Sequence, residues 1–584
     1  MSSLLSRSSL RTRRAAAVTL AAVVAVSGAF GGIALAQAPA TSQGGTAPHA
    51  MVAAAEPDAV EAGLKVLKAG GSAVDAAVAV SAVLGLEEPQ SSGLGGGAFM
   101  TYYDAKTRKV TAYNGREKAP AEASGDWFFG ADGKPMPKAQ AIVGGRSAGV
   151  PGAVAMLHLA QKEHGKLAWK DLFGEAERLA ADGFNVPARM AASASSGAPQ
   201  ARQPDAIAYF TKPDGTKIKS GDLMKNPAYA ATLRKIAAEG PKAILEGPIA
   251  AEIVAKLHQG PYPSTMTLKD LASYQPKVTP AVCRPYREYT VCVPPAPSGG
   301  PAVLEGLGVL ARTDVNKHPN DVQGWYLFSQ ASRLMYADRD RYYGDPDFVS
   351  VPMEGLLAAD YLDARAKLIG ADKAGPPPGP GNPKGAGPRA PDRTQEPGGT
   401  THFVIVDKDG NAVSMTQTVE STFGDGRMVG GFFLNNQLTD FSFSPKDSDG
   451  APAANAVAGG KRPRSSMSPA IVLDKQGRFV AGTGSPGGPS IIAFTLKVLV
   501  GFMDWKLPMQ EAINLPNLIA FDTIYASEPA KYPPGVVAAL AAKGVTLRGG
   551  AFGEGSGEQG IERLPSGGLR GGADPRREGV ARGY

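Results

Sequence analysis

The sequence contains little cysteine and little histidine, and each shortage excludes a kind of chemistry. Among 584 residues there are two cysteines, Cys283 and Cys292, and six histidines. Two cysteines cannot build a zinc site alone, and the chain has no His-Glu-x-x-His motif or other cluster of ligands. We therefore expect no metal and no cofactor. A hydroxyl nucleophile in this chain has few histidines to serve as its base.

The sequence also has only a small excess of positive charge. The formal net charge is +7, and it falls to +3 when the four arginines near the N-terminus are removed. No basic stripe with interleaved aromatic residues occurs, so we expect no nucleic-acid partner. Hydrophobic residues make up 43% and charged residues 20% of the chain, which is ordinary for a globular protein.

Long apolar runs are confined to the N-terminus. Four arginines within residues 7–14 precede an apolar stretch over 15–36, which ends in the sequence ALA. This pattern predicts a secretory signal peptide over 1–36, and therefore a periplasmic or secreted protein without a stable membrane anchor. The alternative is an uncleaved anchor, because residues 15–36 could just span a bilayer.

The two cysteines occur in the segment CRPYREYTVC. They lie symmetrically about Arg287 and Glu288, as a cross-strand pair in a hairpin would. An exported protein could oxidise them, which makes Cys283 and Cys292 a candidate disulfide. Two buried free thiols are the alternative interpretation.

Three regions follow the leader. Helical periodicity dominates up to about residue 374, and residues 374–399 are so rich in proline and glycine that we expect a flexible segment. From residue 400 the chain is rich in β-strand signals: two hairpins, then the motif GSPGG before a long apolar helix. The strands are apolar on both faces, which predicts a sheet covered on both sides. The class is α+β, with αββα layers as the specific arrangement.

The junction Gly399–Thr400 in GGTTHFVIV suggests a nucleophile. The α-amine of an N-terminal threonine, with a pKa near ~8, can act as the base for its own hydroxyl. An internal threonine must first be cut free to own that amine. Gly399 would provide the backbone freedom, and the flexible segment could then move away. We hypothesise self-cleavage before Thr400; the plainer interpretation is that two threonines merely begin a strand.

Three later motifs gather polar groups or backbone amides. Two glycines before a helix offer N–H groups to an anion. The plainer interpretations are an amide-rich loop, a polar turn and a helix cap. The motifs are LNNQLTDFS with Asn436, Gln437 and Asp440, KRPRSSMSP with Ser465 and Ser466, and GSPGG with Gly487 and Gly488.

Taken in order, the motifs resemble those of the γ-glutamyltransferase family of N-terminal nucleophile hydrolases. The resemblance runs over nearly all of the chain after the leader, through VDAAVAVSAVL, PQSSGLGGGAFM, YNGREKAP, YADRDRYYGDPDFVSVP, TTHFVIVDKDGNAVSMTQT, LNNQLTDFS, KRPRSSMSP and GSPGG. It implies a four-layer αββα sandwich. It also implies a proenzyme that cuts itself into a large subunit, 37–399, and a small catalytic subunit, 400–584, which pair with each other.

The resemblance further implies the reaction and the role of each site residue. A γ-glutamyl group from glutathione or a related compound would acylate Thr400 and pass to water, an amino acid or a dipeptide. Thr418 would hydrogen-bond the nucleophile. The other implied roles are the oxyanion hole for Gly487 and Gly488, the substrate α-carboxylate for Arg116, Ser465 and Ser466, and the α-ammonium for Glu420, Gln437 and Asp440.

Two departures from the family pattern matter for the substrate. Glu420 stands where many members have asparagine, and with Asp440 it favours a substrate that keeps its amino group. The loop 441–460 is shorter than the lid of many members and lacks a lid tyrosine. The balance between hydrolysis and transfer therefore stays open.

Three alternatives remain. The first is an acylase of the same fold that acts on glutaryl amides such as cephalosporin side chains. The second is a serine hydrolase using Ser485, although Thr483 replaces the glycine that a nucleophile elbow requires. The third is a secreted binding protein that has lost the cleavage.

Overall fold

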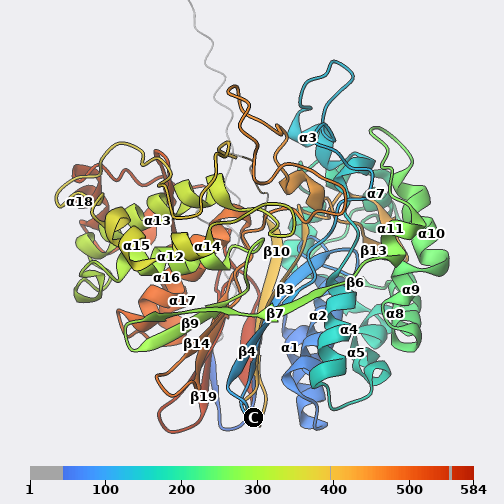
Figure 1. Cartoon of the computed structure of the whole chain (residues 1–584). Coiled ribbons are helices and arrows are strands. Elements are labelled where there is room, and N and C mark those ends of the chain that lie inside the picture. The colour runs from blue at the N-terminus through green and yellow to red at the C-terminus, as the bar shows by residue number, and fades with distance from the viewer. Residues whose placement is uncertain (1–43, 393, 395, 397, 551–554) are drawn as a thin grey trace, which may run out of the picture. The chain divides into compact units, whose positions relative to one another are not determined.

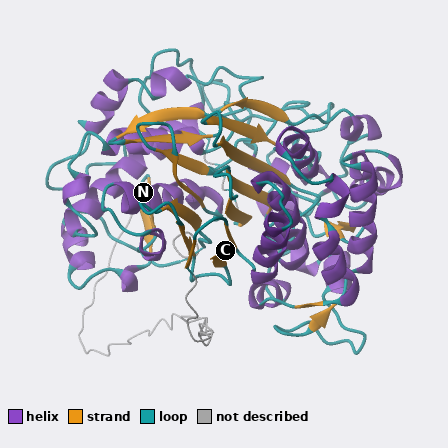
Figure 2. Ribbon diagram, turned by 90° about the horizontal axis from the view of Figure 1, so that it is seen from below, coloured by secondary structure: helices purple, strands orange, loops and turns teal. Residues whose placement is uncertain are grey.

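Two seven-stranded antiparallel sheets form the centre of the fold, and helices lie on both sides of them (Figure 1). The computed structural model describes residues 44–584 except 393, 395, 397 and 551–554, so the predicted signal peptide over 1–36 lies outside the described residues. From below, the strands lie between two groups of helices (Figure 2). The predicted αββα layering is confirmed.

The first sheet, here called the β10 sheet, contains the Gly399–Thr400 junction. Its two central strands are buried at every residue, because the neighbouring helices cover one face and the second sheet covers the other. In spatial order its strands are β20 (Val580–Gly583), β2 (Met51–Ala54), β10 (Gly399–Val406), β11 (Ala412–Glu420), β3 (Gly97–Asp104), β4 (Lys109–Asn114) and β7 (Lys277–Pro280).

The second sheet, here called the β15 sheet, packs against the first through an apolar interface. Val404 and Val406 of the β10 sheet share this core with Ile471 and Phe479 of the β15 sheet. In spatial order its strands are β1 (Gly45–Ala47), β19 (Leu569–Ala573), β18 (Gln559–Arg563), β15 (Phe479–Gly484), β14 (Ala470–Leu473), β9 (Tyr289–Val293) and β8 (Val282–Tyr286).

One helical layer shares a hydrophobic core with the β10 sheet. Before α2, the Ser72 side chain accepts a hydrogen bond from the backbone N–H of Asp75, and the Asp75 side chain accepts one from the backbone N–H of Ser72. This capping box starts a helix that is buried along its whole length. The layer contains α1 (Pro57–Lys68), α2 (Ala73–Glu87), α4 (Ala153–His164), α5 (Gly174–Asp182), α6 (Ala188–Ala194), α7 (Pro204–Tyr209), α8 (Pro227–Glu239), α9 (Lys242–Leu245), α10 (Gly247–Leu257) and α11 (Leu268–Ala272).

The other helical layer shares its core with the β15 sheet. It contains α12 (Gly300–Leu310), α13 (Val322–Tyr342), α14 (Met353–Leu356), α15 (Ala359–Ala366), α16 (Ile491–Met503), α17 (Met509–Asn514) and α18 (Val536–Ala542). The remaining elements are smaller: α3 (Lys138–Ile142) and the pairs β5 (Phe184–Asn185) with β6 (Leu223–Met224), β12 (Met428–Val429) with β13 (Phe432–Phe433), and β16 (Leu518–Phe521) with β17 (Ile524–Ser527).

The predicted hairpins β10–β11 and β14–β15 are confirmed, as is the long helix α16 after GSPGG. The part before residue 374 is rich in helices, and the part from residue 400 is rich in strands, but the two parts share one sheet. Strands β2, β3, β4 and β7 come from before residue 374, yet they extend the sheet that β10 and β11 centre. A two-strand hairpin alone cannot bury both faces, so it takes its neighbours from the earlier part of the chain.

Among the described residues of the segment 374–399, none is in a helix or strand before β10 begins at Gly399. Its described residues are nevertheless tied to the helices behind it. Gly381 accepts a hydrogen bond from the hydroxyl of Tyr342 at 2.6 Å and donates its N–H to Asp338 at 2.6 Å. Proline and glycine exclude regular structure here, but they do not exclude fixed contacts.

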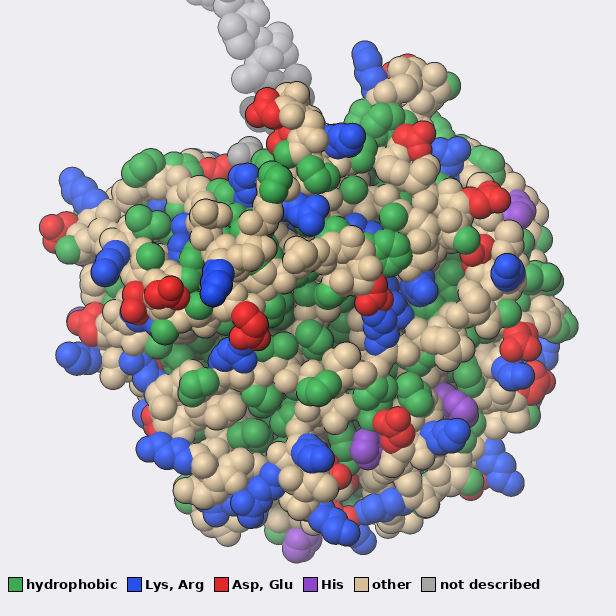
Figure 3. Space-filling view, in the orientation of Figure 1, with side chains coloured by type: hydrophobic (Ala, Val, Ile, Leu, Met, Phe, Trp, Pro, Cys, Tyr) green, Lys and Arg blue, Asp and Glu red, His purple; other side chains and the backbone are tan. Residues whose placement is uncertain are grey.

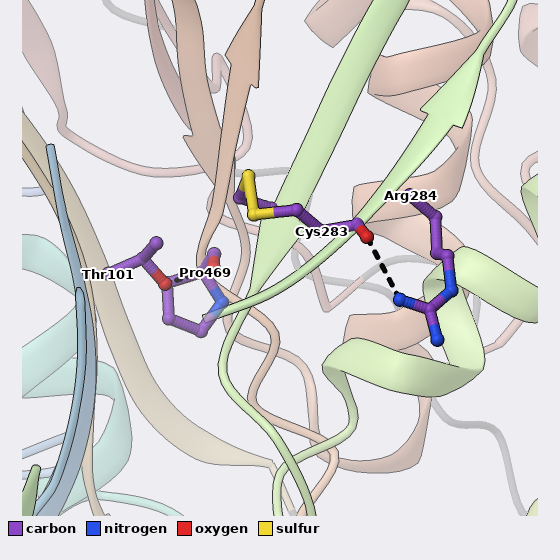
Figure 4. Close-up of a disulfide and its surroundings, with 5 residues drawn as sticks. Thr101, Cys283, Arg284 and Pro469 are labelled. Atoms are coloured by element: carbon purple, nitrogen blue, oxygen red, sulfur yellow. Dashed lines mark hydrogen bonds between the residues drawn. A yellow bond between two sulfur atoms is a disulfide. The ribbon is translucent and has the colours of Figure 1, made fainter. Parts of the chain in front are cut away.

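Cys283 and Cys292 occupy paired positions on β8 and β9, and their sulfurs are bonded (Figure 4). Beside them, the Thr101 hydroxyl on β3 donates to the Pro469 carbonyl at 2.8 Å, which links the two sheets. Within residues 44–584, leaving aside the gaps named above, no helix has the length and apolarity needed to cross a bilayer. Basic and acidic side chains are interspersed over the face shown in Figure 3.

Candidate active site

Thr400 and Thr418 face each other across β10 and β11. The Thr400 hydroxyl donates to the Thr418 hydroxyl at 3.1 Å, and the Thr418 hydroxyl donates to the Gly399 carbonyl oxygen at 2.6 Å. The backbone N–H of Glu420 donates to the same Thr418 oxygen at 2.7 Å. One hydroxyl is thus directed at the next, and that second hydroxyl polarises the carbonyl of the peptide bond before Thr400.

The register of the hairpin shifts at this point. Gly399 is opposite Glu420 while Thr400 is opposite Thr418, so Val419 forms a bulge. Gly399 is not at positive φ, whereas Glu420 is, at 81°. Glycine is required because a Cβ there would lie 2.4 Å from the Glu420 carbonyl oxygen.

Two groups that the sequence analysis missed hold the strand on the other side of Thr400. The guanidinium of Arg577 donates to the Thr400 carbonyl at 3.0 Å, and the Thr401 hydroxyl donates to Glu88 at 2.7 Å. Arg577 and Glu88 also lie 3.5 Å apart. Burial, then the nearby charge of Arg189, lowers the pKa of Arg577 to about 10. Nothing in the sequence DPRREG distinguishes this arginine from a surface one.

Glu420, Gln437 and Asp440 form the acidic end of the cavity beside Thr400. All three are buried. Three of their side-chain oxygens accept no hydrogen bond from an N–H group or a hydroxyl: Oε1 of Glu420, Oε1 of Gln437 and Oδ1 of Asp440. The other Glu420 oxygen accepts from Ser421 and Asn436, each at 2.5 Å. Unpaired buried acceptors are costly, and an ammonium group carries the three donors that would pair them.

Burial raises the pKa of Glu420 well above its ordinary value, and the neighbouring charge of Asp440 raises it further. The raised pKa favours the neutral form of the Glu420 carboxyl, which reduces its repulsion from Asp440. A substrate ammonium placed there would take over that function, because its positive charge favours the ionised form.

Arg116 lies next to Asp440 and is almost completely buried. Its Nη2 donates to Asp440 at 2.7 Å and to the Arg464 carbonyl at 2.6 Å. Its Nε donates to the Pro463 carbonyl at 3.2 Å. The structure places it in the predicted cavity, with much of its donor fork already occupied by the protein.

Ser465 and Ser466 also line the cavity, together with Glu396. The Ser466 hydroxyl donates to Glu396 and accepts from Arg339 at 2.7 Å. The Ser465 hydroxyl accepts from the Met467 N–H at 3.1 Å. Neither Glu396 nor Arg339 was singled out by the sequence analysis, because the YADRDRYYGDPDF motif and the Pro/Gly segment give no sign that they meet.

Gly487 and Gly488 lie where β15 leads into α16. Both have positive φ, 136° and 58°, in the turn before the helix. Gly488 lines the cavity, and a Cβ added at Gly398 would lie 3.9 Å from its backbone nitrogen. The two glycines are therefore beside the chain that precedes the Gly399–Thr400 bond.

Two polar residues near the site are occupied elsewhere. The Ser485 hydroxyl donates to the Pro486 carbonyl at 2.7 Å and is fully buried, so the structure does not present it as a nucleophile. His402 is fully buried, and burial lowers its pKa to about 3. Its Nδ1 contacts the Thr416 hydroxyl at 2.9 Å, which leaves a neutral ring in the interior.

Comparison with known proteins assigns the family. The family model described as Gamma-glutamyltranspeptidase matches residues 59–584. A relative from Bacillus subtilis (strain 168), named glutathione hydrolase proenzyme, is 36% identical over 481 residues, covering 80% of each chain. The protein of the same name from Escherichia coli (strain K12) is 36% identical over 549 residues, covering 91% of each chain.

Solved structures show the same fold. A cephalosporin acylase from Bacillus halodurans superposes with a TM-score of 0.82 at 27% identity, covering 94% of this chain and 98% of that one. The γ-glutamyltranspeptidase of Helicobacter pylori gives a TM-score of 0.52 at 32% identity, covering 55% of this chain and 92% of that one. The match of the family model over most of the sequence, together with these relatives, shows that the chain belongs to the gamma-glutamyltranspeptidase family.

Proposed function

We propose that the protein is an exported γ-glutamyltransferase that cuts itself before Thr400 and then uses Thr400 as its nucleophile. It takes a γ-glutamyl group from glutathione or a related compound and passes it to water, an amino acid or a dipeptide. One observation carries the proposal: a pair of threonine hydroxyls next to the Gly399 carbonyl shares a cavity with three unpaired buried acceptors.

In the self-cleavage step, the Thr400 oxygen attacks the Gly399 carbonyl carbon. Its proton leaves toward the Thr418 oxygen, while the proton of Thr418 is already directed at the Gly399 carbonyl oxygen. The C–N bond then breaks, the nitrogen of Thr400 takes a proton, and an ester joins Gly399 to the Thr400 oxygen. Water hydrolyses this ester, which gives a Gly399 carboxylate and a free Thr400 amine.

In turnover, the freed α-amine of Thr400 takes the proton from its own hydroxyl as that oxygen attacks the γ-carbonyl of the donor. The amine then returns the proton to the leaving nitrogen. Backbone N–H groups at Gly487 and Gly488 would stabilise the oxyanion, since they adjoin the chain before the scissile bond. Water or an acceptor amine then attacks the acyl-threonine by the same route.

The acidic end of the cavity favours a γ-glutamyl donor over a glutaryl donor. A glutaryl group has no α-amine, so it would leave the unpaired oxygens of Glu420, Gln437 and Asp440 without a donor. The resemblance to a cephalosporin acylase keeps acylase activity as the second candidate. We expect kcat/KM for γ-glutamyl 4-nitroanilide to be at least ~100-fold higher than for glutaryl 4-nitroanilide. This factor corresponds to the loss of one charged contact, that of the α-ammonium.

N-terminal sequencing of the purified protein tests both the export and the cleavage. We expect two sequences, one beginning near residue 37 and one beginning with Thr400-Thr401-His402. A single continuous chain in an active preparation would exclude the mechanism. Retention of residues 1–36 would exclude signal removal without affecting the chemistry.

A further inference from the structure

Strands β2 and β10 part before the nucleophile is reached. Among the described residues, β2 pairs with residues 404–406 of β10, and the pairing stops short of Thr400. The last residue of β2, Ala54, pairs instead with Val580 of β20. Arg577 lies three residues before Val580, and its Nη1 donates to the Thr400 carbonyl at 3.0 Å. A guanidinium therefore stands where a neighbouring strand would have supplied a backbone donor.

The side chain of Arg577 is held in one place. It is 7% exposed, and its Nε donates to the Ser556 carbonyl at 3.2 Å. Its own backbone N–H donates to the Asp574 carbonyl at 3.1 Å. A Cβ added at Gly557 would lie 2.3 Å from the Arg577 Nε, so the glycine makes room for the guanidinium. These contacts direct Nη1 at the Thr400 carbonyl.

The same contact brings the guanidinium close to the future α-amine of Thr400. In an extended strand the nitrogen and the carbonyl oxygen of one residue point to the same edge, roughly 3 Å apart. Thr400 is part of the extended strand β10, and cleavage would turn its amide nitrogen into an amine. That nitrogen then lies at most about 6 Å from Nη1 of Arg577. A positive charge at this range disfavours a second positive charge on the amine.

Glu88 offsets the charge of Arg577 only in part. The Glu88 carboxylate lies 3.5 Å from Arg577, but it also lies 2.6 Å from Arg189 and accepts from the Thr401 hydroxyl at 2.7 Å. The pKa of Arg577, which burial lowers to about 10, remains well above neutral pH. Arg577 is therefore charged in the working range of the enzyme and presents positive charge to Thr400.

The other charged groups around β10 and the cavity are compensated among themselves. Burial raises the pKa of three carboxyls and so favours their neutral forms: Glu56, Glu87 and Glu420, the last of which also faces Lys138. The remaining carboxylates have donors of their own: Asp440 has Arg116, Glu396 has Arg339, Glu558 has Lys497, Asp574 has Arg576, Glu562 has Arg570, and Glu578 has the backbone N–H of Arg189.

We propose that Arg577 is a positioning residue that keeps the freed α-amine of Thr400 unprotonated at neutral pH. The inference rests on the proposed function, because the amine exists only after cleavage. The guanidinium fixes the Thr400 carbonyl and disfavours an ammonium on the same residue. A neutral amine can take the proton of the Thr400 hydroxyl, whereas an ammonium cannot. Arg577 contributes no atom to the reaction and acts through Thr400.

The amine can be titrated directly in the wild-type enzyme. Cleaved enzyme is treated briefly with acetic anhydride at several values between about pH 5 and pH 9, and hydroxylamine then removes O-acetyl groups. Mass spectrometry of the two N-terminal peptides gives the acetylated fraction of each amine. The α-amine of the large fragment, with an ordinary pKa near ~8, is the internal reference. We expect the Thr400 amine to titrate about one unit lower, and an equal or higher value overturns the proposal.

The pH dependence of kcat in Arg577→Met tests the residue itself. Saturating γ-glutamyl 4-nitroanilide removes any effect of Glu420 on KM from the measurement. We expect the acid limb of the profile to move to higher pH by about one unit, with kcat at the alkaline plateau within about threefold of the wild type. Arg577→Lys keeps the charge and should restore the limb to within about 0.3 units. A loss of kcat by the same factor at every pH would show a purely structural role and overturn the proposal.

The matched control is Arg582→Met, which removes an exposed arginine of the same terminal segment that pairs with Glu61. Its pH profile should equal that of the wild type. Gel electrophoresis separates the two hypotheses. A wild-type chain that is never cut has no Thr400 amine and overturns the proposed function as well. A cut and active Arg577→Met enzyme with the wild-type profile overturns this inference alone, and if that variant is not cut, the titration of the wild-type amine decides.

Discussion

Two groups of buried charges around Thr400 are compensated in opposite ways. At the acidic end, three oxygens of Glu420, Gln437 and Asp440 are left without donors. Beside Ser466, the guanidinium of Arg339 is paired with a carboxylate of the chain, Glu396. The difference follows from the chemistry of the groups. A buried carboxyl can take a proton and become neutral, as the raised pKa of Glu420 indicates, whereas a guanidinium stays charged and needs an anion.

Replacing the nucleophile should have the largest effect on activity. Without turnover, the contributions of the surrounding charged groups can no longer be compared. Thr400→Ala should yield one uncut chain with activity below ~0.1% of the wild type, because both cleavage and turnover need the same hydroxyl. Gel electrophoresis and γ-glutamyl 4-nitroanilide turnover measure the two properties. Thr400→Ser keeps a hydroxyl and should be cut. Normal two-fragment processing of the alanine variant would falsify the mechanism.

Breaking the acidic end should cost less. Asp440→Asn removes the charge that pairs with both Arg116 and a substrate ammonium, so kcat/KM for γ-glutamyl 4-nitroanilide should fall about 100-fold. Glutaryl 4-nitroanilide, which has no amine, should lose clearly less. Asp447→Asn, in an exposed turn of the following loop, is the control. If both donors lose the same factor, Asp440 serves the fold rather than the ammonium.

The pH dependence of donor binding tests the protonation state of Glu420. Because burial and Asp440 raise its pKa above 4.5, the carboxyl is neutral in acid and ionises only as the pH rises through that raised value. We expect the KM of γ-glutamyl donors to fall by about tenfold as the pH rises through that raised value. In Glu420→Gln this slope should disappear, whereas any slope from the Thr400 amine remains in both proteins. Parallel pH profiles of the two would contradict the assignment.

The smallest effect is expected far from both groups of charges. The pair Cys283 and Cys292 joins β8 to β9 at the edge of the β15 sheet. Replacing both with serine should lower the free energy of unfolding by about 2 kcal/mol or less, since the closed loop is short. Cleavage and kcat/KM should stay within twofold of the wild type. A variant that is no longer cut would show that the hairpin contributes to the geometry at Thr400.

The sequence revealed the site residues that stand in short motifs and missed those that meet only across long sequence separations. Thr400, Thr418, Gln437 and Asp440 stand in short motifs whose order resembles that of a known family, and the structure brings them into one cavity. The contact of Arg339 with Glu396 spans 57 positions, and its contact with Ser466 spans 127. No local pattern marks such pairs, because an arginine in a helix most often faces solvent.

By itself the sequence determined the local elements: the β10–β11 hairpin, the helix after GSPGG, and the glycine before Thr400. These depend on periodicity, turn residues and steric size, which act over a few residues. Only the tertiary structure decided that strands from before and after residue 374 share one sheet, and that Arg577 and Glu88 hold the strand of the nucleophile. It also decided that Glu396 lines the cavity and pairs with Arg339. Burial and charge compensation act through space, between groups that the sequence keeps far apart.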